Sequence, residues 1–144
     1  MYEYGCKVTR VVDGDTIDVD LDLGFDIIYK CRVRLYGIDT PESRTRNKDE
    51  KARGKLASKF LQDAINNGAH VILRTHLKDS KGKFGRVLAS VIVDGIDVNQ
   101  QMVVNHMAVR YEGQSKKDIQ LEHLNNRDIL IQRGLHTLIE NEKT

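Results

Sequence analysis

Hydrophobic and polar residues alternate in the first part of the chain, and this pattern predicts β-strands. The apolar positions of residues 17–23 are separated by three aspartates, so we expect a strand with one buried face and one acidic, solvated face. A weaker alternation over residues 2–12 predicts a strand before it, and residues 27–38 form a longer alternation of apolar and charged residues after it. Because turn residues stand at Asp13-Gly14-Asp15 and at Gly24, the three strands should form a meander.

The period of the apolar residues becomes helical after Asn47. Asn47 and Glu50 have the spacing of a capping box, and Asn66-Asn67-Gly68 should end the helix. Two further strands are predicted at residues 71–76 and 87–93. The apolar residues of the helix share one face: Leu56, Phe60, Leu61, Ala64 and Ile65.

Two more helical patterns follow the last predicted strand. The first begins at the capping residue Asp97 and runs to about residue 105. The second follows Ser115 and should end at Gly134, with an apolar face made of Leu121, Leu124, Ile131 and Leu135. Five short strands with a helix between the third and the fourth are typical of an OB-type barrel. We therefore expect an α+β fold, a five-stranded OB-type β-barrel with about three α-helices, in which residues 1–144 form a single domain.

Composition is that of a soluble globular protein, with 40% apolar residues, 31% charged residues and a formal net charge of +2. The charge is unevenly spread, since residues 44–59 carry seven Lys or Arg against two acids. A basic surface of this kind follows a nucleic-acid backbone in many proteins, and we expect Arg44 and Arg46 to do so here. The alternative, a solvated helix face with paired charges, stays open for Lys55 and Lys59.

Several classes of protein are disfavoured by the spacing of special residues. Cys6 and Cys31 are the only cysteines, and two small buried residues on strands are a simpler interpretation than a disulfide. No spacing typical of a zinc site occurs, and none of the five histidines has ligand spacing to another, so we expect them to be structural or on the surface. The sequence shows no signal peptide and no apolar run of the ~20 residues that a membrane span needs. We expect a monomer without a membrane partner, cytoplasmic, or secreted if a leader was removed.

Three charged turns carry the candidate chemistry: Asp13-Gly14-Asp15-Thr16, the stretch from Arg34 to Glu42, and Lys83 to Arg86. Calcium binds oxygen ligands in loose geometry, and the carboxylates of Asp15 and Asp39 with the carbonyl of Thr40 are such a set. The residue after Thr40 is the only proline, which favours an extended backbone at Thr40. For the Asp-Gly-Asp turn alone, a simple hairpin turn is the alternative.

The two arginines and the remaining glutamate have the chemistry of phosphoryl transfer. Arg34 and Arg86 carry planar guanidinium groups that match phosphate oxygens, and positive charge there stabilises a phosphorus centre that becomes more negative. Glu42 is placed to take a proton from an attacking water. Each residue alone also has a plainer interpretation: a surface arginine paired with an aspartate, or a glutamate that caps a turn.

Taken together, these motifs resemble the thermonuclease family, of which staphylococcal nuclease is typical. The resemblance rests on Asp13-Gly14-Asp15-Thr16, on Arg34 followed by Asp39-Thr40-Pro41-Glu42, and on Gly85-Arg86, and it extends from about residue 8 to residue 135. It implies an OB barrel that binds Ca²⁺ through the residues named above, with Asp13 beside the ion rather than coordinating it. It also implies that Arg34 and Arg86 hold the scissile phosphate and that Glu42 is a general base, with a glutamate that only orients the water as the alternative.

The activity implied by the resemblance is calcium-dependent hydrolysis of phosphodiester bonds in DNA and RNA, single strands favoured. The P–O5′ bond breaks and 3′-phosphate ends remain. This sequence departs from the family at Phe84, where a tyrosine is found in relatives, whereas Lys83 is kept. It also has Tyr111 followed by Glu112-Gly113 where relatives have a second tyrosine, so nucleotide binding should differ. A domain that binds nucleic acid or protein without cutting is the alternative, but such relatives lose site residues that are all present here.

Overall fold

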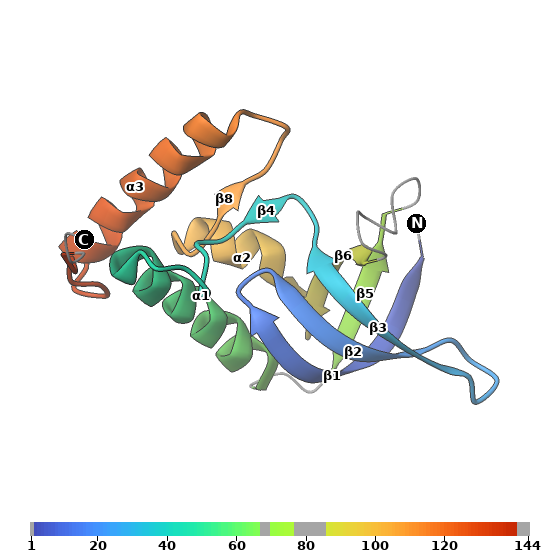
Figure 1. Cartoon of the computed structure of the whole chain (residues 1–144). Helices are drawn as coiled ribbons and strands as arrows, with labels where there is room; N and C mark the ends of the chain where they lie inside the picture. Colours follow the sequence, from blue (N-terminus) through green and yellow to red (C-terminus); the bar gives the residue numbers. More distant parts are fainter. Residues whose placement is uncertain (1, 67–69, 77–85, 141–144) are drawn as a thin grey trace.

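The computed structural model describes residues 2–66, 70–76 and 86–140, and it contains a closed β-barrel with three helices (Figure 1). Five strands form the barrel in the order β3-β2-β1-β5-β6, and parallel pairing of Val33 with Val87 joins β3 to β6 and closes it. The OB-type fold is therefore confirmed. The barrel strands are β1 (Glu3–Asp13), β2 (Thr16–Asp22), β3 (Ile28–Leu35), β5 (Val71–Thr75) and β6 (Val87–Val93).

The alternation along β2 explains how the barrel is filled. Ile17, Val19 and Leu21 point inward and are at most 3% exposed. The residues between them point outward, where Asp18 pairs with Arg32 at 2.8 Å on the neighbouring β3. Exposed ion pairs of this kind contribute only about 0–1 kcal/mol each, so burial of the apolar face is the main source of stability.

The predicted strand at residues 27–38 is wrong in one respect, because the structure divides it. β3 ends at Leu35, the backbone turns at Gly37 with φ of +76°, and β4 (Ile38–Asp39) then pairs with β8 (Val109–Arg110) outside the barrel. Glycine adopts this left-handed conformation without steric cost. The side chain of Asn99 donates to the carbonyl of Tyr36 at 3.0 Å and holds the turn in place. This break carries Asp39 away from the barrel wall.

The three helices begin where the capping residues predict. The Glu50 N–H donates to the side chain of Asn47 ahead of α1 (Lys48–Asn66), and Ser115 accepts from Asp118 N–H at the start of α3 (Lys116–Gln132). Asp97 ends the short strand β7 (Ile96–Asp97) and caps α2 (Val98–Val104). α1 ends at Asn66, and the remainder of its predicted stop signal lies outside the described residues. Within the described ranges no helix is long and apolar enough to span a membrane.

The predicted apolar face of α3 is partly wrong. Leu121 and Leu135 are 57% and 52% exposed, whereas the buried side chains of the helix are His123 and Leu130. α3 lies along one edge of the molecule rather than over the barrel (Figure 1). The face that it buries is partly polar because, as described below, it rests on a charged site.

The two cysteines are free, as expected. Cys6 on β1 and Cys31 on β3 are both half-buried and pack against the barrel core. Burial raises the pKa of the Cys6 thiol to about 11, with a smaller contribution from Cys31. Cys6 is therefore in the protonated, unreactive form at neutral pH.

Candidate active site

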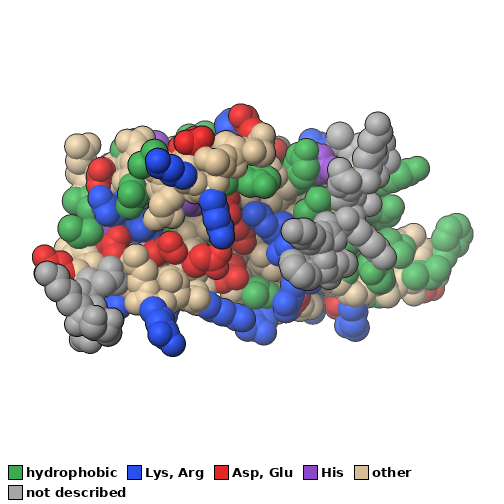
Figure 2. Space-filling view, turned by 45° about the horizontal axis from the view of Figure 1, so that its top comes forward, with side chains coloured by type: hydrophobic (Ala, Val, Ile, Leu, Met, Phe, Trp, Pro, Cys, Tyr) green, Lys and Arg blue, Asp and Glu red, His purple; other side chains and the backbone are tan. Residues whose placement is uncertain are grey.

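A polar cleft opens where the 13–16 turn, the end of β3, β4 and the start of β6 meet. Its volume is about 310 Å³, and we call it the central cleft. In Figure 2 carboxylates form a patch at the middle of the face, with lysines and arginines at its border. The cleft brings together all the residues predicted to be catalytic or metal-binding, since its lining is Asp13, Asp15, Thr16, Arg34, Asp39, Thr40, Pro41, Glu42 and Arg86.

Arg34 is the positive centre of this cleft. Its Nη2 lies 3.5 Å from Asp15 Oδ2 and 3.7 Å from Asp39 Oδ1, while its Nη1 donates to the carbonyl of Leu35 at 2.8 Å. The side chain is only 18% exposed. Charge-assisted contacts are strong where water is partly excluded, so one guanidinium orients both aspartates.

Backbone hydrogen bonds hold the 13–16 turn against the strand ends. The Asp15 carbonyl accepts from Leu35 N–H at 2.8 Å, and Asp15 Oδ2 accepts from the N–H of Thr40 at 3.3 Å. The Ser43 hydroxyl donates to the carboxylate of Asp13. The segment that carries Thr40 and Glu42 is therefore fastened to the turn at both of its ends.

Two glycines let α1 approach this segment closely. A Cβ at Gly54 would lie 2.6 Å from the backbone carbon and oxygen of Glu42, and a Cβ at Gly14 would lie 2.8 Å from that of Ala57. Such distances do not occur between real side chains and backbone, so any larger residue at Gly54 must displace Glu42. The position of Glu42 thus depends on a helix that does not line the cleft at that point.

Glu42 stands at the exposed mouth of the cleft among other acids. Partial burial of the carboxyl raises its pKa above the ordinary 4.5, and the charges of Asp15, Asp13, Asp39 and Glu50 raise it further. Among the described residues none donates a hydrogen bond to Glu42. Its surroundings therefore favour a carboxyl that accepts a proton readily.

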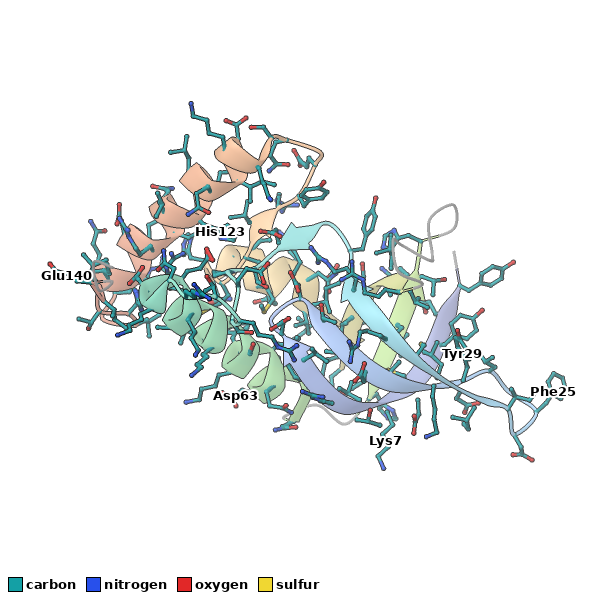
Figure 3. All side chains as sticks on the ribbon, in the orientation of Figure 1. Lys7, Phe25, Tyr29, Asp63, His123 and Glu140 are labelled. Atoms are coloured by element: carbon teal, nitrogen blue, oxygen red, sulfur yellow. The ribbon has the colours of Figure 1, made fainter. Side chains whose placement is uncertain are left out.

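His123 is a residue of the site that sequence reasoning missed. Its Nε2 lies 2.7 Å from Asp39 Oδ2, so Asp39 is held between His123 on one oxygen and Arg34 on the other. Figure 3 shows His123 on the side of α3 that faces β4, far from Phe25 at the tip of the β2–β3 hairpin. His123 and Asp39 are 84 positions apart, and no local motif connects them.

The donor set of the cleft fits a hard cation. Within the described ranges no three His, Cys, Asp or Glu side chains are arranged as a metal cage. A cation here would be bound by the two carboxylates of Asp15 and Asp39 with a backbone carbonyl and water, which suits Ca²⁺ better than Zn²⁺. The crowding of acids that raises the pKa of Glu42 is consistent with a site built for added positive charge.

A second cavity of about 600 Å³ adjoins the central cleft, and we call it the tyrosine cavity. It shares Arg34 and Arg86 with the cleft, and both Tyr36 and Tyr111 line it. Tyr36 stacks on His76 with ring centroids 3.8 Å apart. The sequence motifs singled out only Tyr111, so Tyr36 is an aromatic residue of this cavity that they did not indicate. The other described residues that line it are Leu35, Gly37, Ile38, Leu88, Glu112 and Gly113.

The other basic residues that the sequence singled out have different surroundings. Arg44 and Arg46 are exposed on the loop after Glu42 and do not line the central cleft. Arg53 belongs to the predicted basic surface, but it is 4% exposed and pairs with Asp49, so it is not available there. Lys83 lies outside the described residues, as does Phe84.

Comparison with known sequences agrees with this geometry. A sequence model of the family described as "Staphylococcal nuclease homologue" matches residues 32–135. The chain belongs to the staphylococcal nuclease family. Its homologues include a thermonuclease of Staphylococcus intermedius, 42% identical over 84 residues that make up 58% of this chain and 46% of the relative.

Two other relatives of this staphylococcal nuclease homologue are named as endonucleases. A prophage-derived endonuclease of Bacillus subtilis is 35% identical over 120 residues, with 77% of this chain and 38% of the relative covered. A protein of Escherichia coli described as an uncharacterized endonuclease is 33% identical over 130 residues, covering 90% of this chain and 74% of the relative. The chain thus spans less than half the length of the Staphylococcus and Bacillus relatives.

Proposed function

We propose that this chain is a calcium-dependent nuclease that hydrolyses phosphodiester bonds of DNA and RNA. The observation that carries the proposal is the convergence of Arg34, Arg86 and Glu42 with the carboxylates of Asp15 and Asp39 in one cleft. Membership of a family whose named members include a thermonuclease and endonucleases supports it. A protein that only bound nucleic acid would have no need of an acid with a raised pKa at this point.

Arg34 and Arg86 hold the scissile phosphate in this proposal. Both line the central cleft and the tyrosine cavity, so a phosphate between them lies where the two spaces join. Their guanidinium groups donate to non-bridging oxygens and stabilise the charge that develops as the phosphorus gains a fifth ligand. Because Arg34 is held by Leu35 and two aspartates, little reorganisation accompanies the reaction.

Glu42 takes the proton of the attacking water. A carboxylate whose pKa lies above the ordinary value is a stronger base than a free glutamate, and it stands open to water at the mouth of the cleft. The leaving oxygen is the 5′ oxygen, so the phosphate stays on the 3′ oxygen of the other product. Asp13 fixes the Glu42 segment through Ser43 rather than contacting the ion.

Asp15, Asp39 and the carbonyl of Thr40 would hold the calcium ion. When bound, the ion supplies positive charge next to a phosphate oxygen and to the water. His123 and Arg34 keep the Asp39 carboxylate oriented for this role.

The tyrosine cavity is where the base of the leaving nucleoside binds in this proposal. Tyr36 and Tyr111 offer aromatic surface, and base stacking contributes about 1–3 kcal/mol per base. Lys83, Arg44 and Arg46 then contact phosphates further along a single strand, which is easier to thread through the cleft than a duplex.

The test is a chelator-controlled cleavage assay on matched DNA and RNA oligonucleotides. We expect single-stranded DNA and RNA to be cut in the presence of Ca²⁺, cleavage to stop with chelator, and the new ends to carry 3′-phosphate. Folded protein that binds the oligonucleotides but cuts neither over a range of Ca²⁺ and alkaline pH would leave only the binding-domain alternative.

A further inference from the structure

A third cavity adjoins the central cleft along the segment from Asp39 to Glu42. Its volume is about 460 Å³, and we call it the α3 cavity because one face of that helix forms a wall. Lys116 lies on that face, and Ile119 and Gln120 follow it one helical turn further along. Pro41, Glu42 and Tyr111 lie across from them.

The central cleft therefore has a neighbouring cavity on each of two sides. It shares Arg34 and Arg86 with the tyrosine cavity, and it shares Asp39 to Glu42 with the α3 cavity. Among their lining residues the two outer cavities have only Tyr111 in common. A polynucleotide whose phosphate occupies the cleft must leave it in two directions, and these cavities are the two spaces next to it.

The lining of the α3 cavity suits a nucleoside better than a phosphate. Ile119, Pro41 and Tyr111 provide apolar and aromatic surface for a base or sugar. The carboxylates of Glu42 and Glu50 repel phosphate but accept hydrogen bonds from hydroxyl and amino groups. Lys116, at the exposed start of α3, is placed to meet the next phosphate along the strand.

The chemistry of displacement indicates that the leaving nucleoside does not occupy this cavity. The attacking water and the leaving oxygen lie on opposite sides of the phosphorus. Glu42, which activates the water, lines the α3 cavity and not the tyrosine cavity. We propose that the α3 cavity binds the nucleoside that keeps the phosphate, the one upstream of the cleaved bond, while the leaving nucleoside occupies the tyrosine cavity. This inference rests on the proposed nuclease function.

Two small substrates with the same leaving group test this assignment. Thymidylyl-(3′→5′)-thymidine and thymidine 5′-(methyl phosphate) both lose the 5′ oxygen of thymidine, and they differ only in the group that keeps the phosphate. We expect kcat/KM to be about tenfold or more higher for the dinucleotide, the size of a base-stacking contribution. In the double variant Ile119→Ala, Gln120→Ala, which removes side chains that line the cavity wall, this ratio should fall toward one. Lys117→Ala, an exposed neighbour outside the cavity, should keep the ratio of the wild type.

The outcomes separate this inference from the nuclease proposal. Equal kcat/KM of the wild type for the two substrates, or a ratio unchanged in the double variant, would overturn the assignment while leaving the nuclease intact. If the folded protein cleaved no substrate, the nuclease proposal would fail, and calorimetric binding of thymidine 3′-phosphate would still decide the site. That nucleotide should bind the wild type and Lys117→Ala with the same affinity, and the double variant about tenfold more weakly; equal affinity for all three would overturn the inference.

Discussion

Asp49, in the first turn of α1, and Glu42, in the loop before that helix, lie seven positions apart, and their surroundings are opposite. Asp49 is 4% exposed, and its carboxylate accepts from His136 Nε2 at 2.7 Å, from Ile139 N–H at 3.0 Å and from Arg53 Nε at 3.1 Å. Burial alone would raise the pKa of Asp49, but the hydrogen bonds from Ile139, His136 and Arg53 outweigh it and hold the pKa below the ordinary 3.8.

The groups that shift the pKa of Glu42 are acids rather than hydrogen-bond donors. Burial and four neighbouring carboxylates raise its pKa, and it is exposed to water. A carboxylate that is satisfied by donors stabilises the native fold, whereas one that is crowded by acids is poised to bind a proton or a cation. The difference distinguishes a structural carboxylate from a catalytic candidate in the same short segment.

The largest expected effect comes from replacing Arg34, the positive centre of the central cleft. Arg34 contacts Asp15 and Asp39 much as Arg53 contacts Asp49. Arg34→Ala should lower kcat by about 10³-fold or more, because a guanidinium that stabilises a phosphoryl transition state contributes at least that much. Steady-state cleavage of a fluorescent oligonucleotide measures this, with circular dichroism to verify folding. Arg32→Ala, two residues away on the same face of β3, is the matched control, since Arg32 pairs with Asp18 outside the cleft. An equal decrease of kcat in both variants would contradict a phosphate-holding role for Arg34.

Glu42→Gln tests the catalytic half of the comparison directly. We expect kcat to fall by about 10²–10⁴-fold, the usual contribution of a general base, with little change in KM. The free energy of unfolding should stay the same or increase, because the substitution removes a charge that its acidic neighbours disfavour. Urea denaturation of the same preparation measures it. A variant that lost affinity rather than turnover would indicate that Glu42 positions the substrate.

The sequence predicts the central cleft because its residues belong to three short motifs next to strands in which apolar and polar residues alternate. Cap residues at Asn47 and Ser115 likewise located the helices. What it could not show are contacts between distant elements: His123 meets Asp39 only because α3 folds back over β4. The break of the strand at Gly37 was hidden by an alternating pattern that continues past it, although a glycine within a strand often marks a bend. The ion pair of Arg53 with Asp49 could have been predicted from their four-residue spacing, which places the two side chains on one helix face.

The third prediction concerns Gly54, the residue of α1 that lies against the backbone of Glu42. Gly54→Ala places a methyl group too close to the backbone of Glu42 and should displace that residue from its position in the central cleft. Displacement of a catalytic group by about 1 Å costs on the order of 10²-fold in rate, so kcat should fall by that amount while the fold persists. Lys55→Ala, exposed on the next position of α1, should leave kcat unchanged. Normal activity of Gly54→Ala would mean that the loop can move without harming the site.

The smallest effect on catalysis is expected for Asp49→Asn, where the consequence is stability. Removing one partner of a buried charged cluster should lower the free energy of unfolding by about 3 kcal/mol at neutral pH, and kcat of the folded variant should not change. Because the native pKa of Asp49 is depressed, its contribution is present above the ordinary value of 3.8 and is lost as the pH falls through the lower native value. Urea denaturation from pH 7 down to pH 3 should therefore show a difference in the free energy of unfolding between the wild type and the variant that begins to narrow below about pH 3.8. Asp63→Asn, at an exposed position of the same helix, should hardly change the free energy of unfolding at any pH. If the difference in this free energy between the wild type and Asp49→Asn did not narrow in acid, the carboxylate would contribute by packing rather than by charge.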